Sequence, residues 1–245
     1  MDYVSFKYRN RVLDLYEAAK RGIWNPATDL DWEGAVAPVD PFKKAKADLL
    51  SSLYYGEVKG IELAARSLVL AEKEEEKIYF SIQVLEESRH LEVLGRYLDA
   101  LDQGYEVNPR TIQAFDAILA CESYGEVLAG NSIGTECWAG EIYREIQDQL
   151  KPLDPFMSRM AHKIIGDESR HIEFGRIYFE RRGEVSDEEK RINQKISDLM
   201  IASLDEFANR MGVFDVAVKP IFNRMMHNVE TFRKQMGFLP KVAQI

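Results

Sequence analysis

Two nearly identical phrases of seven residues hold the residue types of a metal site. EESRHLE begins at Glu86 and DESRHIE begins at Asp167, and together they contain two of the four histidines of the chain. Each phrase places a glutamate three residues before a histidine, and residues three apart share one face of an α-helix. Each phrase can therefore present a carboxylate and an imidazole side by side, Glu87 with His90 and Glu168 with His171.

The two carboxylate–imidazole pairs lie on apolar stripes of their predicted helices. Steps of three or four residues from the pairs reach mainly apolar side chains: Phe80, Val84, Leu91, Leu94, Leu98, Ala161, Ile164, Gly175 and Tyr178. A carboxylate that is buried without a partner is very costly, so these glutamates need a cation. The simpler alternative is a surface network of charged helix residues, which explains one such phrase more readily than two copies on inward stripes.

The elements that must position these residues are helices. Gly and Pro are sparse, and the hydrophobic periodicity predicts helices over 4–22, 42–71, 75–102, 110–150, 156–182, 186–210 and 217–236. Ser186 and Glu189 have the spacing of a capping box at the start of one of them. No segment shows the alternation of a strand. The sequence predicts an all-α protein in which four long helices form two antiparallel hairpins, 42–102 and 110–182.

Hairpin geometry indicates where two further ligands lie. Groups at one height of an antiparallel hairpin are equally far from its turn, so the partner of Glu87 should lie near position 57 and that of Glu168 near position 136. Glutamates occupy both positions, Glu57 in LYYGEVKG and Glu136 in IGTECWAG. Glu141 is the alternative to Glu136, because its midpoint with Glu168 also falls in the turn at KPLDP.

This set of ligands predicts a centre of two divalent cations. Four carboxylates and two neutral imidazoles carry four negative charges, and oxygen-rich ligation suits iron or manganese better than copper or structural zinc. A metal-bound histidine usually donates its other N–H to a carboxylate. We expect Asp167 to accept from His90 and Glu86 to accept from His171. The arginines of the two phrases would neutralise these outer carboxylates: Arg89 and Arg170.

At these residues the chain resembles the ferritin-like di-iron carboxylate proteins, over about 45–182. LYEAAKRGIWNPATDLDW resembles the N-terminal segment of oxidases related to the ribonucleotide reductase small subunit. GTECWAGEIY is similar to the helix of the third glutamate in aldehyde-deformylating oxygenase, and EESRH and DESRH resemble the paired motifs of acyl-carrier-protein desaturases. The resemblance implies a ferritin-like four-helix bundle with additional N- and C-terminal helices, and O2 activation by two iron ions or by one manganese and one iron ion. The ligands that it implies are Glu57, Glu87, His90, Glu136, Glu168 and His171.

Several positions depart from particular groups of this superfamily. Leu94 stands where the reductase subunit has its radical tyrosine, so a tyrosyl-radical role is not expected. Gly60 and Asn131 stand at the positions of the valine–tyrosine crosslink of the ligand-binding oxidases, so that crosslink is not expected either. Ile164 stands where the arylamine N-oxygenases carry a seventh ligand, which argues against that group.

Two features near the predicted ligands have two interpretations each. Glycines flank Glu57 and Glu136, where they either open space for O2 and an organic substrate or allow close packing of helices: Gly56, Gly60, Gly134 and Gly140. Tyr97 and Tyr178 lie seven residues after the predicted ligand histidines, either as core aromatic residues or as electron relays.

Composition excludes several classes of function. The chain has 245 residues, 46% of them hydrophobic and 30% charged, and we expect one domain over 1–245, with the core bundle at about 42–182 and C-terminal helices at about 186–236. The net charge of −9 argues against nucleic acid or an anionic membrane as partner. Two cysteines cannot form a disulfide framework. The start, MDYVSFKYRN, lacks the apolar stretch of a signal peptide, and no apolar run is long enough for a membrane span, so a cytoplasmic protein without membrane insertion is expected.

The sequence therefore predicts an O2-activating di-metal (Fe/Fe or Mn/Fe) oxidase or oxygenase that acts on a small or lipid-like organic substrate. We expect an external electron donor and a homodimer. His162 and His227 are expected not to be ligands. The alternatives are an acyl-chain desaturase-like enzyme, a ferroxidase or metal-handling ferritin-like protein, and a helical interaction domain without metal.

Overall fold

The computed structural model describes residues 10–37, 40–103, 106–214 and 217–240, and every regular element among them is a helix. This confirms the predicted all-α class. In chain order the elements are α1 (Arg11–Arg21), α2 (Lys43–Leu70), α3 (Glu74–Leu101), α4 (Pro109–Leu119), α5 (Tyr124–Gly130), the π-helical turn η1 (Asn131–Thr135), α6 (Glu136–Gln149), α7 (Pro155–Arg182), α8 (Asp187–Gly212) and α9 (Val218–Gln235). Of the predicted first helix over 4–22, residues 4–9 lie outside the described residues.

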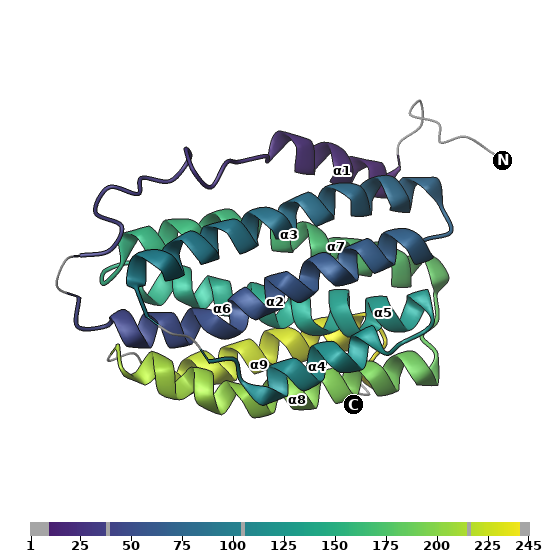
Figure 1. Ribbon diagram of the computed structural model, residues 1–245. Coiled ribbons are helices and arrows are strands. Elements are labelled where there is room, and N and C mark those ends of the chain that lie inside the picture. The colour runs from purple at the N-terminus through teal and green to yellow at the C-terminus, as the bar shows by residue number, and fades with distance from the viewer. Residues whose placement is uncertain (1–9, 38–39, 104–105, 215–216, 241–245) are drawn as a thin grey trace.

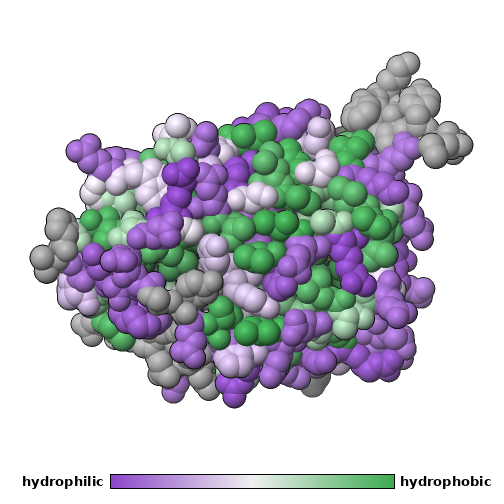
Figure 2. Space-filling model, viewed as in Figure 1, coloured by the Kyte–Doolittle hydropathy of each residue, from purple (hydrophilic) through white to green (hydrophobic). Residues whose placement is uncertain are grey.

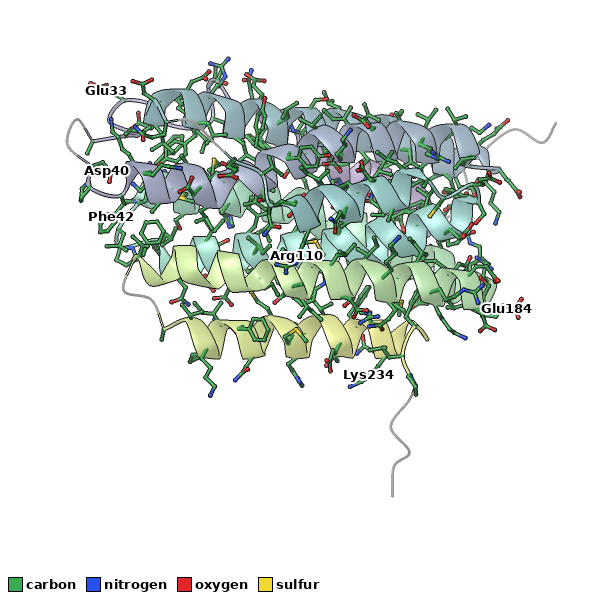
Figure 3. The ribbon with its side chains drawn as sticks, turned by 60° about the horizontal axis from the view of Figure 1, so that its bottom comes forward. Glu33, Asp40, Phe42, Arg110, Glu184 and Lys234 are labelled. Atoms are coloured by element: carbon green, nitrogen blue, oxygen red, sulfur yellow. The ribbon has the colours of Figure 1, made fainter. Side chains whose placement is uncertain are left out.

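Two helical hairpins form the central bundle (Figure 1). α2 packs along α3, and α6 packs along α7, while α5 and η1 continue the line of α6. α1 lies on α3 and α7. On the other side, α8 contacts α4 and α5, and α9 contacts α6 and α8 (Figures 1 and 3). The fold is therefore the ferritin-like four-helix bundle with additional N- and C-terminal helices that the sequence predicts.

Strong local signals delimit α7, the helix that carries one of the two repeated phrases. Asp154 precedes it, and its side chain accepts a hydrogen bond from the N–H of Met157 at 2.8 Å. Pro155 occupies the first helical position, where its missing N–H removes no intrahelical bond. Gly183 follows the helix in a left-handed conformation with φ 77°, which glycine adopts without strain. These caps hold the phrase at a fixed height in the bundle.

The predicted single helix over 110–150 is wrong. α4 ends at Leu119, and a capping box at Ser123 begins α5, because Ser123 Oγ accepts from the N–H of Glu126 at 3.2 Å and the Glu126 carboxylate accepts from Ser123 in return. The break turns α4 away from the bundle to pack against α8. Apolar periodicity is helical on both sides of this break, so the pattern alone did not show it. The capping box predicted at Ser186 and Glu189 is present at the start of α8.

The surface is mixed in character. Figure 2 shows hydrophobic residues gathered over the middle of the face formed by α2 and α3, with hydrophilic residues along the two ends of the molecule. No helix in the described part of the chain combines the length and the apolar character that crossing a membrane requires.

Candidate metal centre

The Nδ1 atoms of His90 and His171 face the same two carboxylates. Nδ1 of His90 lies 3.8 Å from Oε2 of Glu87 and 3.3 Å from Oε1 of Glu168. Nδ1 of His171 lies 3.3 Å from Oε1 of Glu87 and 3.5 Å from Oε2 of Glu168. Each carboxylate therefore offers one oxygen to each histidine, an arrangement that suits two carboxylates shared between a pair of metal ions.

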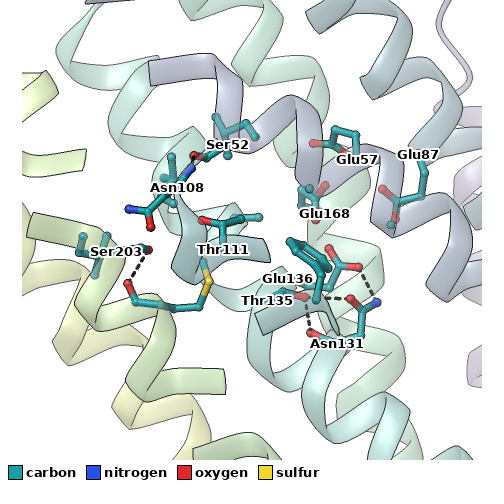
Figure 4. Close-up of a pocket in the computed structure, with 18 of the residues that line it drawn as sticks. Ser52, Glu57, Glu87, Asn108, Thr111, Asn131, Thr135, Glu136, Glu168 and Ser203 are labelled. Carbon is teal, nitrogen blue, oxygen red and sulfur yellow. Dashed lines mark hydrogen bonds between the residues drawn. The ribbon is translucent and has the colours of Figure 1, made fainter. Parts of the chain in front are cut away.

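Glu57 and Glu136 each complete one half of this cluster. Oε2 of Glu57 lies 3.2 Å from Nδ1 of His90, and Oε2 of Glu136 lies 3.8 Å from Nδ1 of His171. The six side chains come from the four helices α2, α3, α6 and α7, and none is more than 6% exposed. Two sets of ligand atoms each lie within 4.8 Å of one another: one on Glu57, Glu87, His90 and Glu168, the other on Glu87, Glu136 and His171. The structure thus brings together all six residues that the sequence singles out (four of them in Figure 4).

The chemistry of this cluster fits cations. Nδ1 of His171 and Oε2 of Glu168 are buried and have no hydrogen-bond partner among the described residues. Burial and the neighbouring carboxylates raise the pKa of Glu87 well above its ordinary value and that of Glu136 to about 8. Burial alone would lower the pKa of both histidines, but the surrounding carboxylates outweigh it and raise the pKa of His90 and His171 well above 6.5. Protons therefore balance the charge of the metal-free cluster, and two divalent ions can replace them.

Outer carboxylates hold the far side of each imidazole. Nε2 of His90 lies 3.1 Å from Oδ2 of Asp167, and Nε2 of His171 lies 3.0 Å from Oε2 of Glu86. Each pair joins α3 to α7, which is the crosswise pairing that the sequence predicts. A carboxylate accepts, so each Nε2 carries the proton and each Nδ1 is left to bind metal.

Arginines and one tryptophan surround the outer carboxylates. Arg170 hydrogen-bonds both Glu86 and Asp167, and Arg89 donates to Asp167 at 3.0 Å. Trp24, in the segment after α1, donates its indole N–H to Asp167 at 2.9 Å and stacks its ring on His90, with the ring centroids 6.4 Å apart. Trp24 was not among the predicted site residues, although it lies in the segment WNPATDLDW whose likeness to reductase-related oxidases was noted.

The π-helical turn η1 supports Glu136 from its own helix. Asn131 donates its side-chain amide to Oε1 of Glu136 at 2.9 Å, and its own Oδ1 accepts from Thr135 at 2.8 Å. Gln83 on α3 donates to the same Glu136 oxygen at 3.4 Å and to Glu87 at 3.2 Å. π-turns inside α-helices occur frequently at functional sites. Sequence reasoning missed both amides as site residues, because their role depends on this turn and on a contact between helices.

Two buried tyrosines donate their hydroxyls to different carboxylates, and only one of these carboxylates belongs to the cluster. Tyr143 on α6 donates its hydroxyl to Oε1 of Glu57 at 2.5 Å, which the sequence analysis did not anticipate. Tyr97 instead donates to Asp154, which forms an ion pair with Lys46 at 2.5 Å. Tyr97 therefore belongs to a buried polar network between the start of α2 and the start of α7.

Other candidates lie away from the cluster. Glu141, the alternative to Glu136, pairs with Arg144 and accepts from Asn228 at 2.7 Å, so it joins α6 to α9 instead. His162 and His227 are exposed. Leu94 and Ile164 are fully buried apolar residues.

A cavity adjoins the cluster on the side of α2 and α6. It encloses about 810 Å³ of space between protein atoms, including its opening to solvent, and four carboxylates of the cluster line it. Gly56 and Gly60 also line it, whereas a Cβ at Gly134 or Gly140 would lie 3.0 or 3.2 Å from an isoleucine of a neighbouring helix. The glycines thus divide between the two interpretations, with space at Gly56 and close packing at Gly134 and Gly140. Gly60 lines the cavity, but a Cβ there would lie 2.7 Å from Oε2 of Glu87.

Solved structures that are similar to this chain include R2-like ligand-binding oxidases with a Mn/Fe cofactor. The chain matches a valine-to-leucine variant of R2-like ligand-binding oxidase with an anaerobically reconstituted Mn/Fe cofactor at TM-score 0.77, with 19% identity over 96% of both chains. It matches R2-like ligand-binding oxidase with an aerobically reconstituted Mn/Fe cofactor at TM-score 0.74, with 18% identity over 94% of both chains. No family model and no curated protein sequence matches the chain. At this identity the similarity establishes the fold.

Proposed function

We propose that this protein is a non-haem di-metal oxidoreductase that uses O2 to oxidise an organic substrate. The observation that carries the proposal is the pair of carboxylates, Glu87 and Glu168, that each offer one oxygen to His90 and one to His171. A buried cluster of this kind, with Glu57 and Glu136 at its two ends, suits two iron ions or one manganese and one iron ion. The Mn/Fe cofactors named for structures with this fold agree with that choice.

Glu57, Glu87, His90, Glu136, Glu168 and His171 would hold the metal pair. When bound, the two ions would supply electrons for the reduction of O2. Asp167 and Glu86 keep the proton of each imidazole on Nε2, so that Nδ1 stays free for metal. Although burial opposes it, the hydrogen bond and charge of His90 keep the pKa of Asp167 below its usual range, so this carboxylate remains an acceptor.

The protein also prepares a place for the substrate. The cavity beside the cluster has a mainly apolar wall, and a substrate that fills it would exclude water from the metal-facing carboxylates. Tyr143 donates to Oε1 of Glu57 and thereby fixes the orientation of that carboxylate at the edge of the cavity. An iron-storage protein has no need of an apolar cavity at this position, so the cavity favours an oxidase or oxygenase.

Two partners belong to the same proposal. The reaction needs an external electron donor, because the sequence contains no flavin or iron–sulfur motif. The protein forms a homodimer in solution, which sedimentation equilibrium of the purified protein tests directly.

Metal analysis combined with O2 consumption tests the proposed function. Protein reconstituted anaerobically with Fe(II), or with Mn(II) and Fe(II), is expected to bind about two metal ions per chain and to consume O2 when air is admitted. The double variant Glu87→Ala, Glu168→Ala should lose both properties, whereas Glu62→Gln on the exposed side of α2 should keep them. Full metal occupancy in the double variant would refute the assignment. Uptake of many iron ions per chain would instead indicate a metal-handling protein.

A further inference from the structure

The cavity beside the cluster has two chemically different ends. Figure 4 shows Glu57, Glu87, Glu136 and Glu168 at one end. At the other end, uncharged polar side chains converge from α2, the start of α4 and α8: Ser52, Asn108, Thr111 and Ser203. The wall between them is largely apolar, with Leu53, Phe115, Ile142, Met200 and Leu204. A molecule that fills this cavity must therefore have a polar end, an apolar middle and an end that faces the carboxylates.

The end of the cavity away from the carboxylates is called the outer polar end. It contains two hydroxyls, on Ser52 and Thr111, whose hydrogen-bonding capacity the described residues do not fully use. Thr111 is 5% exposed and lines the cavity, and its side-chain hydroxyl forms no hydrogen bond with the described residues. Ser52 accepts from the backbone N–H of Asn108 at 3.4 Å, and within the described chain its own hydroxyl hydrogen has no acceptor. Ser203, by contrast, donates to the carbonyl of Met200 at 2.8 Å. Two hydroxyls, on Ser52 and Thr111, are thus available to bind an oxygen atom of a ligand.

No described side chain at the outer end offers a counter-ion to an ionic head group. The described side chains that line the cavity include four carboxylates and no lysine, arginine or histidine. Arg110, beside Thr111 in the chain, donates to the carbonyl of Ala202 at 3.0 Å and does not line the cavity. A buried carboxylate, phosphate or ammonium group would lack a counter-ion at this end, and an unpaired buried charge is far more costly than a neutral hydroxyl or carbonyl.

The length of α2 between the two ends limits the size of the ligand. Ser52 and Glu57 are five residues apart on one helix, which corresponds to an axial rise of about 7.5 Å. A head group bound at Ser52 therefore places a carbon several bonds away beside the metal-facing carboxylates. A medium-length chain or a single ring spans this distance, and a long chain would need to fold back or leave the cavity.

We infer that the substrate class of this site is an uncharged amphiphile of medium length, an alcohol, aldehyde or ketone, that binds with its oxygen on Ser52 and Thr111 and its carbon chain directed toward Glu57 and Glu136. The inference rests on the proposed function for what happens to the bound molecule, but not for the binding itself. It assigns recognition to the outer polar end, and it makes the metal-facing end the site of oxidation.

Binding measured on the anaerobic metal-loaded protein tests the inference with three probes of equal length. 1-Octanol, octanoate and octylammonium differ only in head group, and their affinities are measured by isothermal titration calorimetry. We expect 1-octanol to bind at least tenfold more tightly than either charged probe. The double variant Ser52→Ala, Thr111→Val should weaken 1-octanol binding by about tenfold, as expected for lost hydrogen bonds. The single variant Thr111→Ser, which keeps both hydroxyls, should retain most of the affinity of the wild-type protein for 1-octanol.

Control variants separate recognition from a general effect on folding. Ser81→Ala removes an exposed helix hydroxyl that bonds only the carbonyl of Ile78, and it should leave all three affinities unchanged. Gly56→Leu should block the cavity and abolish 1-octanol binding while the far-UV circular dichroism stays the same.

The outcomes distinguish this inference from the proposed function. Tighter binding of octanoate, or an unchanged affinity in the Ser52→Ala, Thr111→Val variant, would overturn the inference. Absence of binding by all three probes to protein that holds two metal ions would overturn it as well and leave the proposed function intact. Head-group-dependent binding to protein that takes up no metal would support the inference and refute the proposed function.

Discussion

At the scale of single residues, the cluster is built from two similar halves. His90 and His171 each use one ring nitrogen for a carboxylate of the opposite helix and direct the other toward Glu87 and Glu168. Six ionisable groups without cations between them must share protons, and this explains why the pKa values of both histidines and of Glu87 are raised. Metal binding and proton binding therefore compete for the same atoms.

Metal binding should release protons, and the metal affinity should rise with pH. Glu136, with a pKa near 8, and both histidines, with pKa values well above 6.5, hold protons at neutral pH in the metal-free protein. A raised folded-state pKa means that the folded protein binds more protons than the unfolded chain, so the raised pKa of Glu136 makes the metal-free protein lose stability as pH rises from about 4.5 toward 8. Calorimetry of Mn(II) binding in buffers of different ionisation enthalpy measures the released protons. A binding heat that is the same in every buffer would contradict this prediction.

At the scale of elements, the positions of helix breaks and close approaches decide where the ligands lie. η1 interrupts the α5–α6 line directly before Glu136 and aims Asn131 at that carboxylate. On α2, Gly60 lets Glu87 of α3 approach its backbone, since a Cβ there would lie 2.7 Å from Oε2 of Glu87. Gly56, one turn earlier, has room for a Cβ, whose nearest neighbour would be Phe115 at 3.5 Å. The two glycines thus have different roles although they lie on one helix.

Alanine substitutions at Gly60 and Gly56 should differ in their effects on the metal content and the stability of the protein. Gly60→Ala is expected to displace the Glu87 carboxylate and to reduce the metal content below two ions per chain, because Glu87 is shared between the two halves. Gly56→Ala should keep the metal content and raise stability by about 0.5–1 kcal/mol, the usual gain in helix propensity. Elemental analysis and thermal denaturation of the two variants provide the comparison. Equal metal content in both variants would show that the close approach at Gly60 does not matter for the site.

At the scale of the whole molecule, metal binding and fold stability should be coupled. The cluster joins all four helices of the bundle, and α1 adds Trp24 through the segment that follows it. Without cations, the bundle buries several carboxylates at its centre, which is costly. The metal ions therefore act on the folding equilibrium of the entire bundle as well as on its chemistry.

Metal loading should raise the melting temperature. At a free metal concentration of about 100 times Kd, binding adds about 2.7 kcal/mol per site to the free energy of unfolding. For a chain of this size, each kcal/mol shifts Tm by about 2–4 °C, so one filled site corresponds to about 5–11 °C. Scanning calorimetry with and without Mn(II) measures the shift, and the Glu87→Ala, Glu168→Ala variant serves as the control without a site. An identical Tm for loaded and metal-free wild-type protein would contradict the coupling.

The sequence by itself determined the features that depend on local geometry. Spacing of three residues on a helix placed Glu87 with His90 and Glu168 with His171, and equal distance from the two hairpin turns located Glu57 and Glu136. The structure brings these six together, while their ligation of metal stays a prediction. Helical period and chain turns are short-range properties, so one sequence carries them without an alignment.

Other contacts between distant groups were decided only by the tertiary structure. The break between α4 and α5, the contact of Trp24 with Asp167, and the convergence of Gln83 and Asn131 on Glu136 all depend on how helices pack. The polar outer end of the cavity likewise combines side chains from α2, α4 and α8 that no sequence spacing relates. Periodicity says which face of a helix is buried, but the identity of the residue it meets is settled by packing between helices far apart in the chain.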